Sequence, residues 1–313
     1  MAKKTGKKTG SKKPRVKVVK EAEAKAPATP APRPKLPNAW KLTKAAWQIL
    51  WKNRVLFLGV TIIYGLLSLI LVQGIAGGTD VSGIKHDLNQ AFTGSLGSLA
   101  SGFSVFAVLV GSTGNSSSQT AGSYQLTLGI ITSLAVIWAL RQIMAGKRIR
   151  IRDAYYRGMA PLIPFILVIF VIGIQLIPFI IGSTLYSLVV TNGIAIGLLE
   201  RLVFLLLFLA GISWSIYMVS ASLFALYIVT LPDMTPLKAV RSARDLAKGR
   251  RWPIILRLIF LPVVLLVAAA IIMVPIIIVL TFLAQWVFFL LSMFTLVAVH
   301  AYLYTLYREL LNE

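Results

Sequence analysis

Long apolar segments follow one another along the chain from residue 55 to residue 307. A helix of about 20 apolar residues crosses the hydrocarbon core of a bilayer. Residues 253–307 form one apolar stretch that is too long for a single helix, so we divide it at 281–285. The pattern predicts an all-α integral membrane protein with six transmembrane helices, at about residues 55–75, 126–145, 161–190, 199–230, 253–280 and 285–307.

Three features qualify this pattern. Pro178 and Pro275 are expected to kink or end helices, because proline cannot donate a backbone hydrogen bond. Residues 96–110 are apolar but short, and serine and glycine interrupt them. We expect this segment to be interfacial or re-entrant within one large outside segment, residues 76–125. If it crossed the membrane, every later span would reverse its orientation.

The basic residues fix an expected orientation. The chain has 32 Lys and Arg residues and a formal net charge of +22. In the six-span arrangement, all of them except Lys85 and Arg201 fall on the same side of the membrane. Cytoplasmic loops carry an excess of Lys and Arg. The distribution therefore predicts a multi-pass protein of the cell membrane with both termini in the cytoplasm.

Residues 235–252 have the pattern of an amphipathic helix followed by the start of a span. Thr235 is a suitable N-cap, Pro236 suits the first helical position, and Gly249 suits the position after the helix end. At 100° per residue, one arc is apolar and the opposite arc is basic. The apolar arc holds Ala239, Val240, Ala243, Leu246 and Ala247, and the basic arc holds Lys238, Arg241, Arg244 and Lys248. This arrangement is typical of a helix lying at the inner-leaflet interface.

Residues 42–52 and 149–158 repeat the plan of a basic, aromatic-flanked amphipathic segment before an odd-numbered span. The simplest architecture is three helical hairpins, each introduced by a cytoplasmic interfacial helix. Alternatively, any positively charged loop between spans has this composition. The residues expected to contact lipid head groups or another anionic partner are Lys238, Arg241, Arg244, Lys248, Arg250, Arg251, Trp252, Arg148, Arg150 and Arg152.

Residues 1–37 differ in composition from residues 38–313, which form the membrane domain. The segment is rich in lysine, then in alanine and proline, and it cannot bury enough apolar area to offset chain entropy. We expect a disordered cytoplasmic tail. Anionic phospholipids are its expected partners. Nucleic acid or an acidic protein is the alternative, through charge alone, because the tail has no aromatic side chain to stack on bases.

The sequence offers little catalytic or metal-binding chemistry. It contains no cysteine, ten acidic residues and two histidines. Asp80, His86 and Asp87 lie together, but in a glycine-rich loop we expect them to be solvated. Gln175 and His300 fall inside predicted spans, where they are expected to make intramembrane polar contacts. These observations predict a protein that is not an enzyme and that has no cofactor or metal.

Residues 225–260, ALYIVTLPDMTPLKAVRSARDLAKGRRWPIILRLIF, resemble a pattern in bacterial multi-span membrane domains. These domains include the one attached to some glycerophosphoryl diester phosphodiesterases, and related uncharacterised families. The matching residues are Asp233, Ala239, Ser242, Lys248, Gly249 and Trp252. The resemblance implies an integral membrane domain. It implies no activity, because a phosphodiesterase domain is not part of this sequence.

Three functional hypotheses follow. The first is a non-catalytic membrane protein that organises or binds the inner leaflet, or recruits partners, through its basic interfacial helices and polybasic tail. The second is a passive or lipid-handling transporter. The third is a membrane subunit of a separate enzyme.

Overall fold

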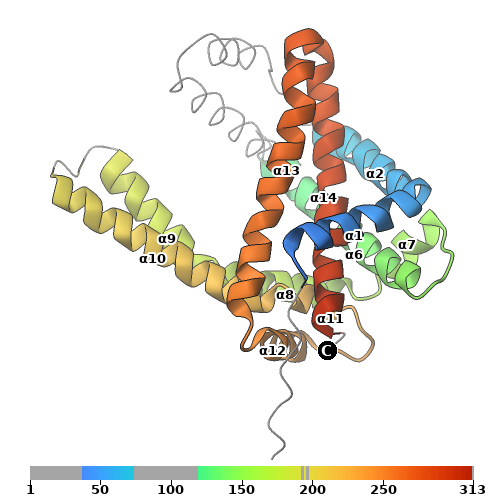
Figure 1. The fold of residues 1–313 in the computed structure, drawn as a ribbon, viewed down its shortest axis with the longest axis horizontal. Helices are drawn as coiled ribbons and strands as arrows, with labels where there is room; N and C mark the ends of the chain where they lie inside the picture. Colours follow the sequence, from blue (N-terminus) through green and yellow to red (C-terminus); the bar gives the residue numbers. More distant parts are fainter. Residues whose placement is uncertain (1–36, 74–118, 192–193, 195–196, 312–313) are drawn as a thin grey trace, which may run out of the picture. The chain divides into compact units, whose positions relative to one another are not determined.

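The computed structural model of the chain describes residues 37–73, 119–191, 194 and 197–311. Within these ranges the chain forms helices and turns and no strand (Figure 1). The elements are α1 (Ala39–Lys52), α2 (Arg54–Ser68), η1 (Leu69–Gln73), α6 (Gln119–Met144), α7 (Ile151–Gly158), α8 (Leu162–Gln175), α9 (Ile177–Tyr186), η2 (Ser187–Thr191), α10 (Leu198–Ser222), α11 (Ala225–Ile228), α12 (Pro236–Ala247), α13 (Arg251–Val279) and α14 (Thr281–Leu311).

Several of these helices are long and apolar enough to cross a membrane, which confirms the prediction of helices with several candidate spans. Within the described ranges, five helical segments qualify individually: Arg54–Val72, Gly122–Met144, Leu198–Ile228, Arg251–Ile277 and Phe282–Leu311. A sixth is reached if α7 and α8, which meet at 71°, are taken together as one bent span.

The third apolar segment, residues 161–190, breaks at Leu176, between α8 and α9. This confirms the expectation for Pro178, whose nitrogen carries no hydrogen to donate to the carbonyl one turn earlier. Of the two outcomes expected for Pro275, a kink or a helix end, the structure excludes the helix end, because Pro275 lies inside α13, which continues to Val279.

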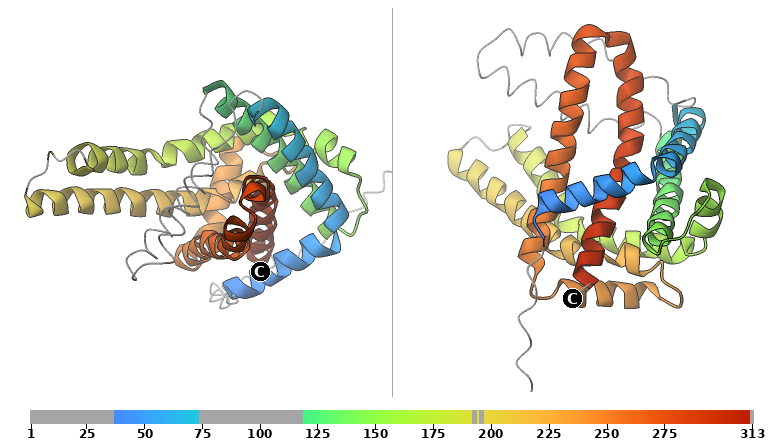
Figure 2. Two further views of the ribbon diagram at one scale, coloured as in Figure 1. Left: turned by 90° about the horizontal axis from the view of Figure 1, so that it is seen from above. Right: turned by 45° about the vertical axis from the view of Figure 1, so that its right-hand side comes forward.

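The long helices pack in neighbouring pairs. α13 and α14 run side by side, and α1 lies across both of them (Figure 2). The side of α1 that faces them buries Leu42, Ala46 and Leu50, spaced four residues apart, so one helical stripe makes the contact. α2, α6 and α14 also contact one another, and α9 packs along α10.

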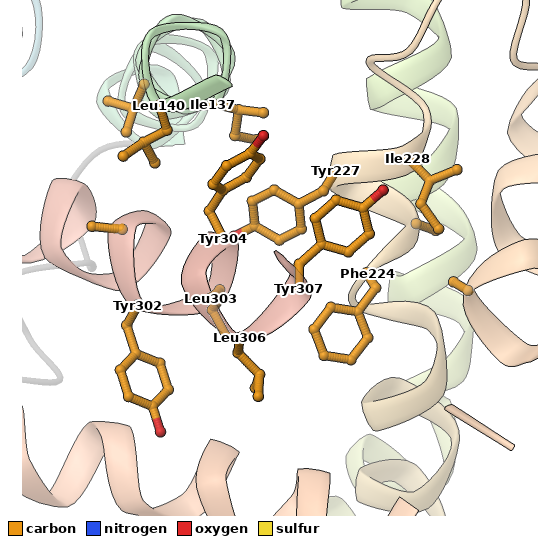
Figure 3. Close-up of a cluster of buried hydrophobic side chains, with 14 of the residues drawn as sticks. Ile137, Leu140, Phe224, Tyr227, Ile228, Tyr302, Leu303, Tyr304, Leu306 and Tyr307 are labelled. Atoms are coloured by element: carbon orange, nitrogen blue, oxygen red, sulfur yellow. The ribbon is translucent and has the colours of Figure 1, made fainter. Parts of the chain in front are cut away.

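The largest buried cluster joins residues of α1, α2, α6, α8, α10, α11, α12, α13 and α14. Its centre is a group of tyrosine rings shown in Figure 3. The ring of Tyr227 lies 5.8 Å from the rings of both Tyr304 and Tyr307, and the ring of Phe224 lies 6.4 Å from that of Tyr307. Such ring pairs add about 0.5–1.5 kcal/mol each to the energy of burial. This aromatic cluster therefore ties α11 firmly to the C-terminal end of α14.

Some sequence predictions fall on other parts of the chain. Residues 1–36 of the tail, the apolar segment 96–110 and the group Asp80, His86 and Asp87 lie outside the described residues.

Candidate functional site

The basic amphipathic segment forms the helix that the sequence predicted. α12 spans Pro236–Ala247, with Thr235 in an extended conformation as its N-cap and Pro236 in its first turn. The chain leaves the helix through Lys248 and Gly249, and the φ of Gly249 is 80°. Only glycine adopts this left-handed conformation without strain, so the sequence contains both the start and stop signals of the helix.

The apolar side of α12 lies against the protein itself. Ala239, Val240, Ala243 and Ala247 are buried, and α12 contacts α8, α10 and α11. The small alanine side chains let the helix approach its neighbours closely. The helix is therefore fixed to the protein by packing, whereas the amphipathic pattern alone was equally compatible with burial in lipid.

The cations of α12 lie outside this buried contact. Lys238, Arg241, Arg244 and Lys248 are all exposed. Trp252, which is 70% exposed, follows at the start of α13. Arg148, Arg150 and Arg152 are also exposed, before and within α7. We call the exposed side chains of Lys238, Arg241, Arg244 and Lys248 the basic face of α12.

Arg250 departs from the expected set. It is only 9% exposed, and its two terminal guanidinium nitrogens are buried. The adjacent Arg251 is the first residue of α13 and is half-buried. Because the terminal nitrogens of Arg250 are buried, its guanidinium does not contact head groups in this arrangement.

A pocket of about 500 Å³ lies between α10, α12 and α13. Two of its lining residues, Arg244 and Arg251, belong to the set expected from the sequence to contact lipid head groups or another anionic partner. The guanidinium carbon of Arg251 lies 4.3 Å from the centre of the Tyr217 ring, which is a close cation–π contact. The other lining residues, all from α10, are Trp214, Met218 and Ala221.

Sequence reasoning missed the contribution of α10 to this pocket. Trp214, Tyr217 and Met218 are spaced three and four residues apart, so they share one helical face. Aromatic side chains that include a polar group are enriched where spans meet the interface. That spacing near the end of an apolar segment was the available signal.

Arg141 has a structural role that was also missed. Its guanidinium donates to the backbone oxygen of Thr230 at 2.7 Å, to the backbone oxygen of Tyr227 at 3.3 Å, and to the Thr230 hydroxyl. These carbonyls follow or end α11, where helical carbonyls lack partners within the helix. Arg141 thus attaches the end of α6 to the chain segment that leads into α12.

The two polar residues inside apolar helices both contact other elements. The amide nitrogen Nε2 of Gln175 donates to the hydroxyl of Ser222 on α10 at 2.9 Å, and both residues are buried. His300 is also buried, and its Nδ1 lies 3.1 Å from the hydroxyl of Tyr227. Neither residue lines one of the cavities described here, so we place both in helix packing.

Among the residues that the structure describes, no three His, Asp or Glu side chains come together as metal ligands would. The chemistry of the pocket between α10, α12 and α13 is that of an anion receptor, with two guanidinium groups and aromatic surface. In comparisons with known proteins, no family model, no curated protein and no solved structure matches the chain.

Proposed function

We propose that this chain is a non-catalytic multi-span membrane protein that binds and organises anionic phospholipids of the inner leaflet. In this proposal its helices form six spans in three hairpins, introduced by the interfacial helices α1, α7 and α12. Both termini lie in the cytoplasm, and the protein resides in the cell membrane. The resemblance of residues 225–260 to the phosphodiesterase-associated membrane domain is compatible with such a role and adds no activity.

The sidedness of α12 is the observation that supports this proposal most directly. Its apolar side is held by α8, α10 and α11, so its four cations are presented outward on a fixed support. Each Lys or Arg close to an anionic leaflet contributes about 1 kcal/mol of attraction. Trp252, exposed at the start of α13, is a side chain favoured at head-group depth. Together these features suit a surface that enriches anionic lipid around the protein.

The lysine-rich residues 1–37 add cations that suit the same anionic lipids. Nucleic acid or an acidic protein is the alternative partner for this segment, because a lysine-rich segment attracts anionic lipid, nucleic acid and acidic protein alike through charge.

Spin-labelled lipids test the proposal. The full chain is reconstituted in vesicles containing a trace of spin-labelled phosphatidylglycerol or phosphatidylcholine, and electron paramagnetic resonance measures the fraction of label immobilised by the protein. We expect a preference for phosphatidylglycerol. It should weaken as salt rises from about 0.01 M to about 0.15 M, because the screening length falls from about 30 Å to about 8 Å.

Charge on α12 is the variable to change. Lys238→Gln/Arg241→Gln/Lys248→Gln should clearly reduce the preference, because it removes three of the cations that attract anionic lipid. The matched control is Lys238→Arg/Arg241→Lys/Lys248→Arg, which keeps the charge and should keep the preference. Equal immobilisation of both lipids by the unaltered protein would refute the proposed function.

An apolar groove favours lipid handling as a second candidate. A cavity of about 660 Å³ lies between α1, α13 and α14, and its lining is almost entirely apolar. The rings of Trp47 and Phe294, which are 6.3 Å apart, form part of its wall. A hydrocarbon chain suits this lining. If the protein moves lipids through the groove, Ala268→Trp should slow the transfer of a fluorescent phospholipid between leaflets; an unchanged rate, or no transfer, would exclude this candidate.

A further inference from the structure

The pocket between α10, α12 and α13 combines two cations with no anion of its own. Arg244 comes from α12 and Arg251 from α13, and no Asp or Glu lines the pocket. Among the described residues, neither of these two arginines forms a hydrogen bond or an ion pair. Two like charges facing one cavity repel each other, so the pocket is stabilised when an anion enters it.

The Tyr217 ring holds Arg251 in position. The 4.3 Å cation–π contact orders the guanidinium without providing it with a hydrogen-bond acceptor. The side chain therefore loses little further freedom when a ligand binds, and its N–H donors stay available. A guanidinium matches the paired oxygens of a phosphate, which it can bind through two parallel hydrogen bonds.

The start of α13 adds to the positive potential of the pocket. Arg251 is the first residue of this 29-residue helix. The first backbone N–H groups of a helix have no partner within it, and the aligned peptide dipoles place partial positive charge there. Arg251 therefore lines the pocket from a helix start, where the helix dipole adds to the positive charge of its side chain.

The rest of the lining indicates a phosphate attached to hydrocarbon. Four of the six lining residues are Trp214, Tyr217, Met218 and Ala221, so apolar and aromatic surface predominates. Trp214, one of the lining residues, is 65% exposed and belongs to a helix apolar enough to cross a membrane. A free phosphate would leave this surface in contact with water, whereas the acyl chains of a lipid would cover it.

We propose that this pocket binds one anionic phospholipid, with Arg244 and Arg251 bound to its phosphodiester and its acyl chains lying against α10 and α13. This deepens the proposed function and rests on it. A head group without positive charge, such as the glycerol of phosphatidylglycerol, fits beside two arginines. The ammonium group of phosphatidylcholine is repelled by them, so the site discriminates between the two lipids.

Native mass spectrometry of the full chain in detergent tests the proposal. Phosphatidylglycerol and phosphatidylcholine with identical acyl chains are titrated separately, and glycerol 3-phosphate is a third probe that has the phosphate but no chains. We expect one phosphatidylglycerol to be retained at low lipid concentration, with weaker retention of phosphatidylcholine and no retention of glycerol 3-phosphate. Equal retention of the two lipids would overturn the proposal, and so would retention of glycerol 3-phosphate as tight as that of the lipid.

Variants assign the binding to the pocket. Arg244→Gln and Arg251→Gln should each weaken retention of the single phosphatidylglycerol about ten-fold, as expected for losing a charged hydrogen-bond donor. Tyr217→Leu should weaken it about three-fold, and Tyr217→Phe should not, because phenylalanine keeps the ring face. Lys52→Gln, on the exposed surface of α1, removes the same charge outside the pocket and should leave retention unchanged. Thermal unfolding of each variant establishes that it is folded.

The result separates this proposal from the proposed function. If spin-labelled phosphatidylglycerol is enriched around the protein but Arg244→Gln and Arg251→Gln retain the single lipid as tightly as the unaltered chain, the pocket proposal fails alone. If neither enrichment nor a retained lipid is found, both fail.

Discussion

Gly211 lies where α10 meets the start of α9, and the space there admits no side chain. A Cβ at this position would lie 2.5 Å from the carbonyl oxygen of Pro178 and 3.2 Å from its carbonyl carbon, whereas ordinary contacts begin at 3.4 Å. The obstructing atoms are backbone atoms, so they cannot rotate away as a side chain would. Gly211→Ala must therefore push the two helices apart by about 1 Å.

The cost follows from three contributions. Forcing a methyl group into a packed contact costs about 1–3 kcal/mol. Separating the helices also stretches the hydrogen bond from the backbone N–H of Phe179 to the Ser215 hydroxyl, now 3.1 Å long, and losing it costs about 1 kcal/mol. Alanine is favoured over glycine within a helix by about 1 kcal/mol, which offsets this loss. The net expectation is destabilisation by about 1–3 kcal/mol.

Gly173 provides the matched control, because it also lies within an apolar helix, α8, but a Cβ there would meet nothing within 4 Å. Gly173→Ala replaces glycine by a residue favoured in helices and introduces no clash, so it should stabilise the protein by up to about 1 kcal/mol. Both variants of the full chain are unfolded by increasing dodecyl sulfate in mixed micelles, with helicity followed by circular dichroism. If Gly211→Ala resists unfolding as well as Gly173→Ala does, α9 and α10 do not pack as the structure describes.

Three further outcomes are expected. Val240→Asp places a carboxylate at a position that is 5% exposed, which should detach α12 at a cost of about 3 kcal/mol and make it sensitive to limited proteolysis. Ser242→Asp adds the same charge on the exposed side and should leave α12 protected. Equal protection of α12 in both variants would contradict its packing. Arg141→Leu removes the hydrogen-bond donors to the end of α11 and should destabilise the protein by about 2 kcal/mol in the dodecyl sulfate unfolding assay. An unchanged unfolding curve would contradict the structural role of Arg141. Reporters fused after Gly249 and after Ser117 should indicate cytoplasm and outside, respectively; a cytoplasmic signal at Ser117 would mean that residues 96–110 cross the membrane and would refute the six-span arrangement.

Much of the helical content could be predicted because burial in lipid has a simple sequence requirement. A span needs a long apolar run, and such runs mark α2, α6, α10, α13 and α14. The break at Leu176 was foreseeable from Pro178 for an equally local reason. For Pro275 the sequence left open a kink or a helix end, and α13 continues past it, because proline is tolerated in a span when neighbouring groups accommodate the freed backbone.

The pocket was only half predictable. Thr235, Pro236 and Gly249 mark α12 through local backbone chemistry, and the basic face follows from helical periodicity. Tyr217 lies in α10 and Arg251 in α13, with α12 between them in the chain. Their contact therefore depends on how the helices pack, which local sequence does not give. Arg250 is buried whereas Arg251 lines the pocket. Arg250 directly precedes α13 and Arg251 begins it, and helix boundaries are the least certain part of a sequence pattern.

The distribution of the core has a mechanical consequence. Among the described residues, the cluster around Tyr227, Tyr304 and Tyr307 joins most of the helices near the C-terminal end of α14. The start of α14 belongs to a smaller cluster with the second half of α13, and Phe289 and Met293 pack against residues of α2, η1 and α6. When bilayer thickness changes, a span adjusts by tilting, at a cost of fractions of a kcal/mol per Å. Because most of the described packing of the α13–α14 pair lies toward the aromatic end, we expect a thinner or thicker bilayer to move the other end more than the aromatic end, to which α12 is attached.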